Sequence, residues 1–133
     1  MKKVKTKKTD ELNLFVFDKE ISSVNDIVAI TKTEKDRKNI KLIVIDYLQL
    51  VPCGDAKANT RSDQIGIVTR KLKQLAIQTQ LPIIALSQLN RDKTRKTYNL
   101  TDLRESGNIE QDADSVWFIW RPSAHGHDFY TCE

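Results

Sequence analysis

Apolar residues along the chain fall into short continuous runs, which alternate with longer stretches where they recur every three or four positions. Short runs rich in β-branched residues are typical of strands, and the longer spacing is typical of helices that bury one face. This alternation predicts an α/β fold, with helices flanking a mainly parallel sheet. The length of 133 residues suits one small domain, and no internal repeat interrupts the pattern.

The strand-like runs differ in how completely we expect them to be buried. The run LIVI at 42–45 is continuous and β-branched, which is typical of a parallel strand covered by helices on both faces. Pro82 suits the first position of a strand. Trp117, Phe118 and Trp120 are interpreted as alternating across two buried faces, with base stacking as the alternative. The predicted strands are residues 12–17, 41–50, 83–87 and 115–120.

Two helix starts carry the same local signal. Ser23 and Thr60 are each followed three residues later by an aspartate, Asp26 and Asp63, the spacing of a capping box. We expect the first helix to run to about Arg37. The second helix has one apolar face, which consists of Ile65, Val68, Leu72, Leu75 and Ala76.

Composition adds modest information about partners and compartment. The formal net charge of +4 makes a phosphate-rich partner plausible without requiring one. Cys53 and Cys132 match neither a zinc site nor a disulfide framework, which fits a reducing, cytoplasmic setting. The apolar run at 14–17 is too short for a signal core or a membrane span. We expect residues 1–11 to form a solvated basic tail, with a nucleic-acid-binding arm as the alternative.

Two polar residues follow predicted strands. Asp46 ends the apolar run at 42–45, and Gln88 follows the strand at 83–87. Ligands of parallel α/β sheets bind beyond the carboxyl ends of the strands, so both residues are expected at one site. Asp46 could hold Mg²⁺ and Gln88 could donate to a phosphate or orient a water. The alternative for Asp46 is a carboxylate that only caps a loop or helix.

Several segments together resemble the DnaB family of hexameric replicative helicases. The resemblance extends from about residue 12 to residue 121. It divides the chain into a basic tail at 1–11, a partial motor domain at 12–121 and a C-terminal tail at 122–133, where no strong pattern remains. The segments are DYLQL at 46–50, LKQLA at 72–76, LSQLNR at 86–91, DLRESG at 102–107 and IEQDAD at 109–114.

The resemblance implies a RecA-like, doubly wound, mainly parallel sheet with flanking helices. It implies ATP hydrolysis with Mg²⁺, coupled to 5′ to 3′ translocation on single-stranded DNA during DNA replication, by a cytoplasmic ring of six subunits with no membrane segment. Asp46 looks like the Walker B aspartate, which serves metal, nucleotide and catalysis. Gln88 looks like the glutamine that senses the terminal phosphate.

A predicted short helical stretch at 100–114, broken near Gly107, contains the family's DNA-contact segment. Arg104, Glu105 and Gly107 resemble the loop that lines the central channel. Arginine bonds phosphate, and glycine allows close approach of a backbone N–H; Glu105 would act through its backbone or by orienting Arg104. The alternative is a surface ion pair beside a helix-breaking glycine.

Two further segments have weaker signals. The basic loop at 91–96 could face the same channel, or it could simply be solvated. His125 and His127 have no cluster of candidate ligands around them, so we assign them no metal role.

The sequence departs from the family's pattern in one important respect. It contains no GxxxxGK[ST] phosphate-binding loop and only four glycines. The resemblance further implies that a central strand, the catalytic glutamate and the arginine finger have no counterpart here. We therefore expect a helicase-motor fragment that hydrolyses no ATP alone. A non-catalytic DNA-binding or helicase-docking module is the alternative, and a RecA- or RadA-type recombinase core explains the motifs less well.

Overall fold

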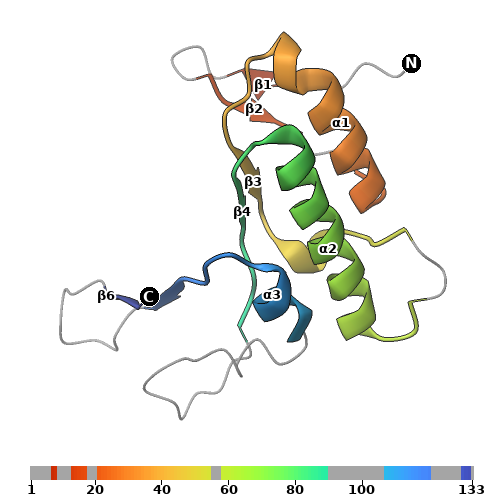
Figure 1. The fold of residues 1–133 in the computed structure, drawn as a ribbon, viewed down its shortest axis with the longest axis vertical. Helices are drawn as coiled ribbons and strands as arrows, with labels where there is room; N and C mark the ends of the chain where they lie inside the picture. The colour runs from red at the N-terminus through yellow and green to blue at the C-terminus, as the bar shows by residue number, and fades with distance from the viewer. Residues whose placement is uncertain are drawn as a thin grey trace.

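A computed structural model of the chain describes residues 7–8, 13–17, 21–54, 58–89, 107–120 and 130–132, and the structural statements below concern these residues. They form an α/β structure, as predicted, with a parallel strand pair and flanking helices (Figure 1). The elements in chain order are β1 (Lys7–Lys8), β2 (Phe15–Val16), α1 (Val24–Arg37), β3 (Ile43–Ile45), the 3₁₀ helix η1 (Leu48–Leu50), α2 (Arg61–Thr79), β4 (Ile83–Ala85), α3 (Gly107–Asp112), β5 (Phe118–Trp120) and β6 (Tyr130–Cys132).

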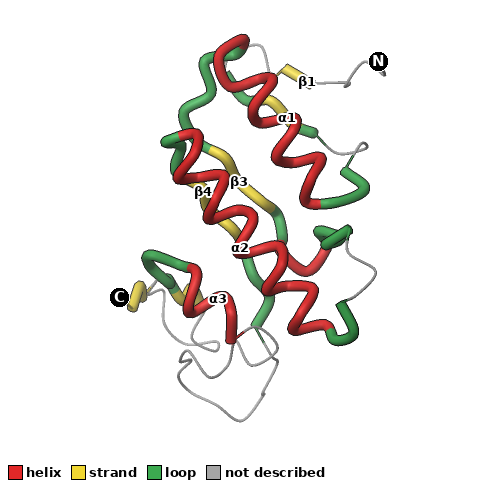
Figure 2. Tube along the Cα trace, turned by 45° about the vertical axis from the view of Figure 1, so that its right-hand side comes forward, coloured by secondary structure: helices red, strands yellow, loops and turns green. Residues whose placement is uncertain are grey.

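The centre of the fold is the parallel pair β3 and β4, which lie side by side in Figure 2. Ile43 pairs with Ile83 and Ile45 with Ala85, and helix α2 provides the crossover between the two strands. Both strands are shorter than the predicted runs at 41–50 and 83–87. The chain leaves the β3 ladder to form η1, although the Leu48 amide still donates to the Leu86 carbonyl over 2.9 Å.

Helix α1 begins where the capping pattern predicts, at Ser23. The Asp26 carboxylate accepts hydrogen bonds from the Ser22 hydroxyl (2.7 Å), the Ser22 amide (2.9 Å) and the Ser23 amide (2.8 Å). These bonds, the one from the Ser22 hydroxyl foremost, lower the pKa of Asp26 because they stabilise its anion. Three donors at the first turn therefore define the start of the helix.

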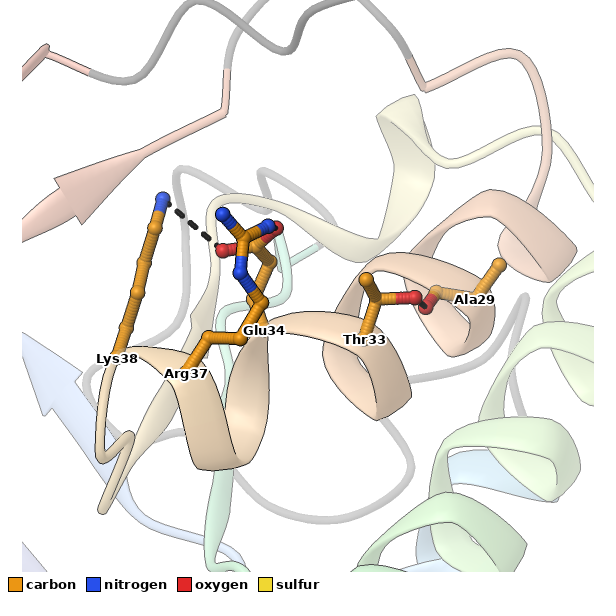
Figure 3. A network of polar contacts seen from close by, with 5 residues as sticks. All are labelled: Ala29, Thr33, Glu34, Arg37 and Lys38. Atoms are coloured by element: carbon orange, nitrogen blue, oxygen red, sulfur yellow. Dashed lines mark hydrogen bonds and ion pairs between the residues drawn. The ribbon is translucent and has the colours of Figure 1, made fainter. Parts of the chain in front are cut away.

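The C-terminal end of α1 contacts the segment that contains β2 through Lys38. Glu34 forms ion pairs with Arg37 and Lys38, at 2.8 and 3.3 Å (Figure 3). The Lys38 ammonium also lies 4.6 Å from the ring centroid of Phe15 and 5.1 Å from that of Phe17. One lysine thus contacts both the carboxylate of its own helix and two aromatic faces of the N-terminal strand segment.

Helix α2 packs against α1 and provides more residues of the core cluster than any other described element. Thr60 and Asp63 form the predicted capping box, with the Asp63 amide donating to the Thr60 hydroxyl over 3.0 Å. The Lys35 ammonium of α1 donates to the Thr79 carbonyl at the C-terminus of α2 (2.7 Å), where a cation is favourable. The buried apolar cluster consists of Val24, Ile27, Ile45, Leu48, Cys53, Ile65, Val68, Leu72, Leu75, Ile109 and Phe118.

The other face of the parallel pair is not covered by the described residues, which corrects the prediction that the strand at 41–50 is covered by helices on both faces. Val44 is 55% exposed and Ile84, its partner in the register, is 39% exposed. Helices α1 and α2 lie on one side of β3 and β4, so among the described helices there is no second layer against which the outward side chains could pack (Figures 1 and 2). Leu42 and Leu86 are exposed as well.

Two antiparallel strand pairs complete the described structure. Strand β1 pairs with β2, and β5 pairs with β6. Sequence analysis predicted neither β1 nor β6, which lie in the stretches interpreted as tails. In β5 and just before it the predicted alternation is present, but one face is open: Phe118 is buried, whereas Trp117 is 69% exposed. The prediction of two buried faces was therefore wrong for this strand.

Candidate functional site

The parallel pairing of β3 and β4 brings two sequence-predicted site residues to the same edge of the sheet. Asp46 is the first residue after β3, and the Asp46–Tyr47 peptide bond is cis. Gln88 lies three residues after the end of β4. Because the strands are parallel, both residues lie beyond carboxyl ends that share one edge, as predicted.

Both side chains are exposed and available for a ligand. Neither the carboxylate of Asp46 nor the side-chain amide of Gln88 forms a hydrogen bond or ion pair with any of the described residues. The alternative interpretation of Asp46, a carboxylate that caps a loop or helix, would require such a bond. A carboxylate with no partner among the described residues can bind Mg²⁺ through its oxygens, and such an amide can donate to a phosphate.

Gln49 lies between these two residues and was not singled out from the sequence. It belongs to η1 and hydrogen-bonds across to Ser87 and to the backbone of Gln88. The available signal was its place in the DYLQL segment, where it is a polar residue between the buried Leu48 and the exposed Leu50. Nothing local indicates that its partner lies 39 residues away in the sequence.

A shallow depression of about 510 Å³ lies beside this edge, at η1, the segment after it and the start of α2. Asp46 and Gln88 do not line it. The edge formed by the two strand ends and this depression are therefore adjacent but distinct surfaces. The lining residues are Gln49, Leu50, Val51, Pro52, Cys53, Gly54, Arg61 and Gln64.

Of the predicted DNA-contact residues, only Gly107 lies within the described part of the chain, as the first residue of α3. Helix α3 packs on α2 through a short hydrogen bond from the buried Thr69 hydroxyl to the Asp112 carboxylate (2.6 Å). An ion pair between Lys73 and Asp114 adds a second contact. Together, these contacts fix α3 and the residues just after it on α2, the long helix of the core.

The remaining candidates fall outside the described residues. These are Arg104, Glu105, the basic loop at 91–96, His125 and His127. Within the described ranges no group of three or more histidine, cysteine, aspartate or glutamate side chains is placed to hold a metal ion. Among the described helices, none is both long and apolar enough to cross a bilayer.

Comparison with known proteins identifies relatives over most of the chain. The sequence model of the family described as "DnaB-like helicase C terminal domain" matches residues 1–130. The chain is 40% identical over 121 residues to "Replicative DNA helicase DnaB" of Mycobacterium leprae (strain TN), covering 89% of the chain and 20% of that protein. It is 36% identical over 124 residues to "Probable plasmid replicative DNA helicase" of Chlamydia psittaci, covering 91% of the chain and 26% of that protein.

A solved structure supports the same relationship at the level of the fold. A chain of "The Structure Of A DnaB-Like Replicative Helicase And Its Interactions With Primase" matches with a TM-score of 0.71 and 43% sequence identity. The match covers 79% of this chain and 26% of the other. The present chain thus spans about a fifth to a quarter of the length of these relatives. Since the family model covers nearly the whole sequence, the chain belongs to the DnaB-like helicase C-terminal domain family.

Proposed function

We propose that this chain forms one edge of the ATP site and part of the DNA-contact surface of a replicative DNA helicase motor. The complete motor would couple ATP hydrolysis to 5′ to 3′ movement along single-stranded DNA and to unwinding, as a ring of six subunits in the cytoplasm. The observation that supports this most strongly is the placement of Asp46 and Gln88 at one edge of a parallel strand pair, with side chains that bond to none of the described residues.

In this proposal Asp46 holds Mg²⁺ through a carboxylate oxygen or through the ion's water shell. The bound ion would neutralise charge on the nucleotide phosphates. Gln88 donates its side-chain amide to the terminal phosphate or orients a water there. Both roles need an exposed side chain that forms no other bond. The side chains of Asp46 and Gln88 are exposed and bond to none of the described residues.

The 133 residues contain no GxxxxGK[ST] sequence, so the backbone donors and the lysine of a phosphate cradle must come from other sequence. Such a cradle supplies most of the affinity for the β- and γ-phosphates. We therefore propose that the 133-residue chain on its own binds ATP weakly and hydrolyses none at a meaningful rate.

The DNA-contact role is assigned to the segment with Arg104, Glu105 and Gly107. Arg104 would pair with backbone phosphate, and Gly107 would allow close approach of the backbone to the strand. The anchoring of α3 on α2 by Thr69 and Asp112 supports this proposal, because a contact loop that transmits force needs a fixed end. Sequence-independent phosphate contacts of this type weaken as salt increases.

The experiment that tests the nucleotide-edge proposal uses Mn²⁺ as a paramagnetic substitute for Mg²⁺ in an NMR titration of the chain. Mn²⁺ also prefers oxygen ligands, and it broadens resonances close to it. We expect broadening at the Gln88 backbone amide, loss of that broadening in Asp46→Asn, and no change in Asp36→Asn. Asp36 is a matched control because it is also exposed but lies on α1. Broadening at Gln88 that persists in Asp46→Asn would contradict the proposal.

The absence of a GxxxxGK[ST] sequence favours one second candidate, a non-catalytic DNA-binding or helicase-docking module. The two proposed functions are distinguished by measuring the binding of fluorescent single-stranded DNA at low and moderate salt, together with the Mn²⁺ titration. Salt-sensitive DNA binding that Arg104→Ala weakens, with no Mn²⁺ effect near Asp46, would favour the module. Arg70→Ala is the control, since Arg70 is an exposed arginine on α2.

A further inference from the structure

Helix η1 carries Gln49 from the β3 strand end toward the segment that follows β4. It begins two residues after Asp46, and the buried Leu48 side chain fixes it on the core. The Leu48 amide donates to the Leu86 carbonyl over 2.9 Å, so η1 is bonded to the exit of β4. This anchoring brings the side chain of Gln49, which is half-buried, against residues 87 and 88.

The side-chain amide of Gln49 bonds to residues 87 and 88 through both its nitrogen and its oxygen. Its Nε2 donates to the Ser87 hydroxyl at 3.0 Å and, more weakly, to the Gln88 carbonyl at 3.4 Å. Its Oε1 accepts from the Gln88 backbone amide at 3.2 Å. A primary amide is suited to this geometry, because it offers a donor and an acceptor side by side without a charge.

These bonds substitute for a sheet ladder that has already ended. Strand β4 stops at Ala85. The backbone bonds that still join the two strand exits are formed by Leu86, whose amide donates to the Ile45 carbonyl and whose carbonyl accepts from the Leu48 amide, both over 2.9 Å. Beyond it, the backbone N–H and C=O of Gln88 both bond to one side chain, that of Gln49. The side chain of Gln88 stays free of the described residues.

The backbone of Gln49 is itself held from the opposite side. The guanidinium of Arg61, the first residue of α2, donates to the Gln49 carbonyl. The same guanidinium donates to the Gln64 side chain over 3.2 Å, which keeps it in place on the helix. Gln49 is therefore fixed at its backbone by α2 while its side chain fixes the backbone of Gln88.

We propose that Gln49 is a positioning residue, which holds the main chain of Gln88 so that the free Gln88 amide is presented at the same strand edge as Asp46. The functional meaning of this role rests on the function proposed above, in which Gln88 contacts the terminal phosphate. The role itself is local, because it concerns only how the backbone of Gln88 is held. It adds a side-chain link between the two strand ends of the site to the backbone bonds at Leu86.

The test is amide hydrogen exchange followed by NMR on the 133-residue chain without nucleotide or metal. Gln49→Leu keeps the size of the side chain and removes its donor and acceptor, so we expect exchange at the Gln88 amide to speed up about fivefold, the worth of one hydrogen bond. Exchange at the buried Leu75 on α2 should not change. Gln78→Leu, at an exposed glutamine of α2, is the matched control and should leave Gln88 unaffected.

A conservative variant separates positioning from general support of the fold. Gln49→Glu retains an acceptor for the Gln88 amide but loses the Nε2 donor, so we expect protection of Gln88 between wild type and Gln49→Leu. Unchanged exchange at Gln88 in Gln49→Leu would overturn the proposal. Equal acceleration at Gln88 and Leu75 would also overturn it, because Gln49 would then support only global stability. A negative Mn²⁺ titration would remove the proposed function and leave this exchange result standing.

Discussion

At position 54 the backbone adopts a φ of +71°, a conformation that residues with a Cβ rarely occupy. A Cβ built there would lie 2.8 Å from the Cβ of Ser23, the residue that starts α1. The close approach follows from a backbone bond in which the Val24 amide donates to the Pro52 carbonyl at 2.8 Å. Glycine at this position thus allows the segment after η1 to pack on the N-terminus of α1.

We expect Gly54→Ala to lower the free energy of unfolding by about 1–3 kcal/mol, since it combines a strained φ with a steric overlap. Urea unfolding followed by circular dichroism measures the change. The double variant Gly54→Ala with Ser23→Gly removes the overlap but not the strain, so it should recover part of the loss. A single variant as stable as the wild type would show that this segment relaxes without cost.

At the scale of elements, α2 decides most of the packing. Its apolar stripe follows the predicted helical spacing, and Leu75 at the centre of that stripe is 1% exposed. Ile77, two positions further along, falls on the opposite side and is 60% exposed. The same helix therefore contains one buried and one exposed aliphatic residue, and the two can be compared in the same helical backbone.

We expect Leu75→Ala to destabilise the fold by about 2–5 kcal/mol, because it removes buried methyl groups and leaves a cavity in the core cluster. Ile77→Ala should change the free energy of unfolding by no more than about 0.5 kcal/mol. Thermal unfolding by calorimetry or circular dichroism gives both values. Equal losses in the two variants would mean that α2 is rotated relative to the arrangement described above.

At the scale of the whole molecule, the described residues leave one apolar face of β3 and β4 open. Val44 on β3 and Ile84 on β4 are exposed, and so are Leu42 just before β3 and Leu86 just after β4. Parallel sheets are normally covered on both faces, and contiguous exposed apolar patches promote association. We therefore expect the chain by itself to bind hydrophobic dyes and to self-associate.

Replacing Val44 and Ile84 together by threonine should reduce both properties, because threonine keeps the β-branched shape while adding a hydroxyl. Sedimentation velocity measures self-association and dye fluorescence measures the exposed surface. Ile77→Thr, which removes a comparable exposed side chain from α2, should have a smaller effect on both. If the double variant associates as strongly as the wild type, association uses another surface.

The local features of this fold were predictable because their partners lie close in the sequence. The two capping aspartates, Asp26 and Asp63, bond to groups three or four residues away. The strand-end position of Asp46 followed from one apolar run. The positions of β1 and β6 were not predictable, because short strands form where a distant segment provides a ladder and not where propensity is high.

The candidate site was likewise predictable only in part. The resemblance to DnaB-type helicases indicated Asp46 and Gln88, and family membership is confirmed by the match over residues 1–130. Their individual roles, and those of Arg104, Glu105 and Gly107, stay predictions. Sequence analysis did not identify Gln49, because its proposed role depends on contacts with residues 38 and 39 positions away in the sequence.

The sequence by itself determined the helix starts, the apolar faces and the α/β class, since these depend on backbone hydrogen bonds and side-chain spacing within one or two turns. Only the tertiary structure decided which strand faces are covered, how Gln49 connects two strand ends, and how Thr69 anchors α3 through Asp112. Those outcomes depend on which distant surfaces meet in space. The local sequence pattern does not indicate which surfaces meet, because an apolar strand residue such as Val44 gives the same pattern whether its face is covered or open.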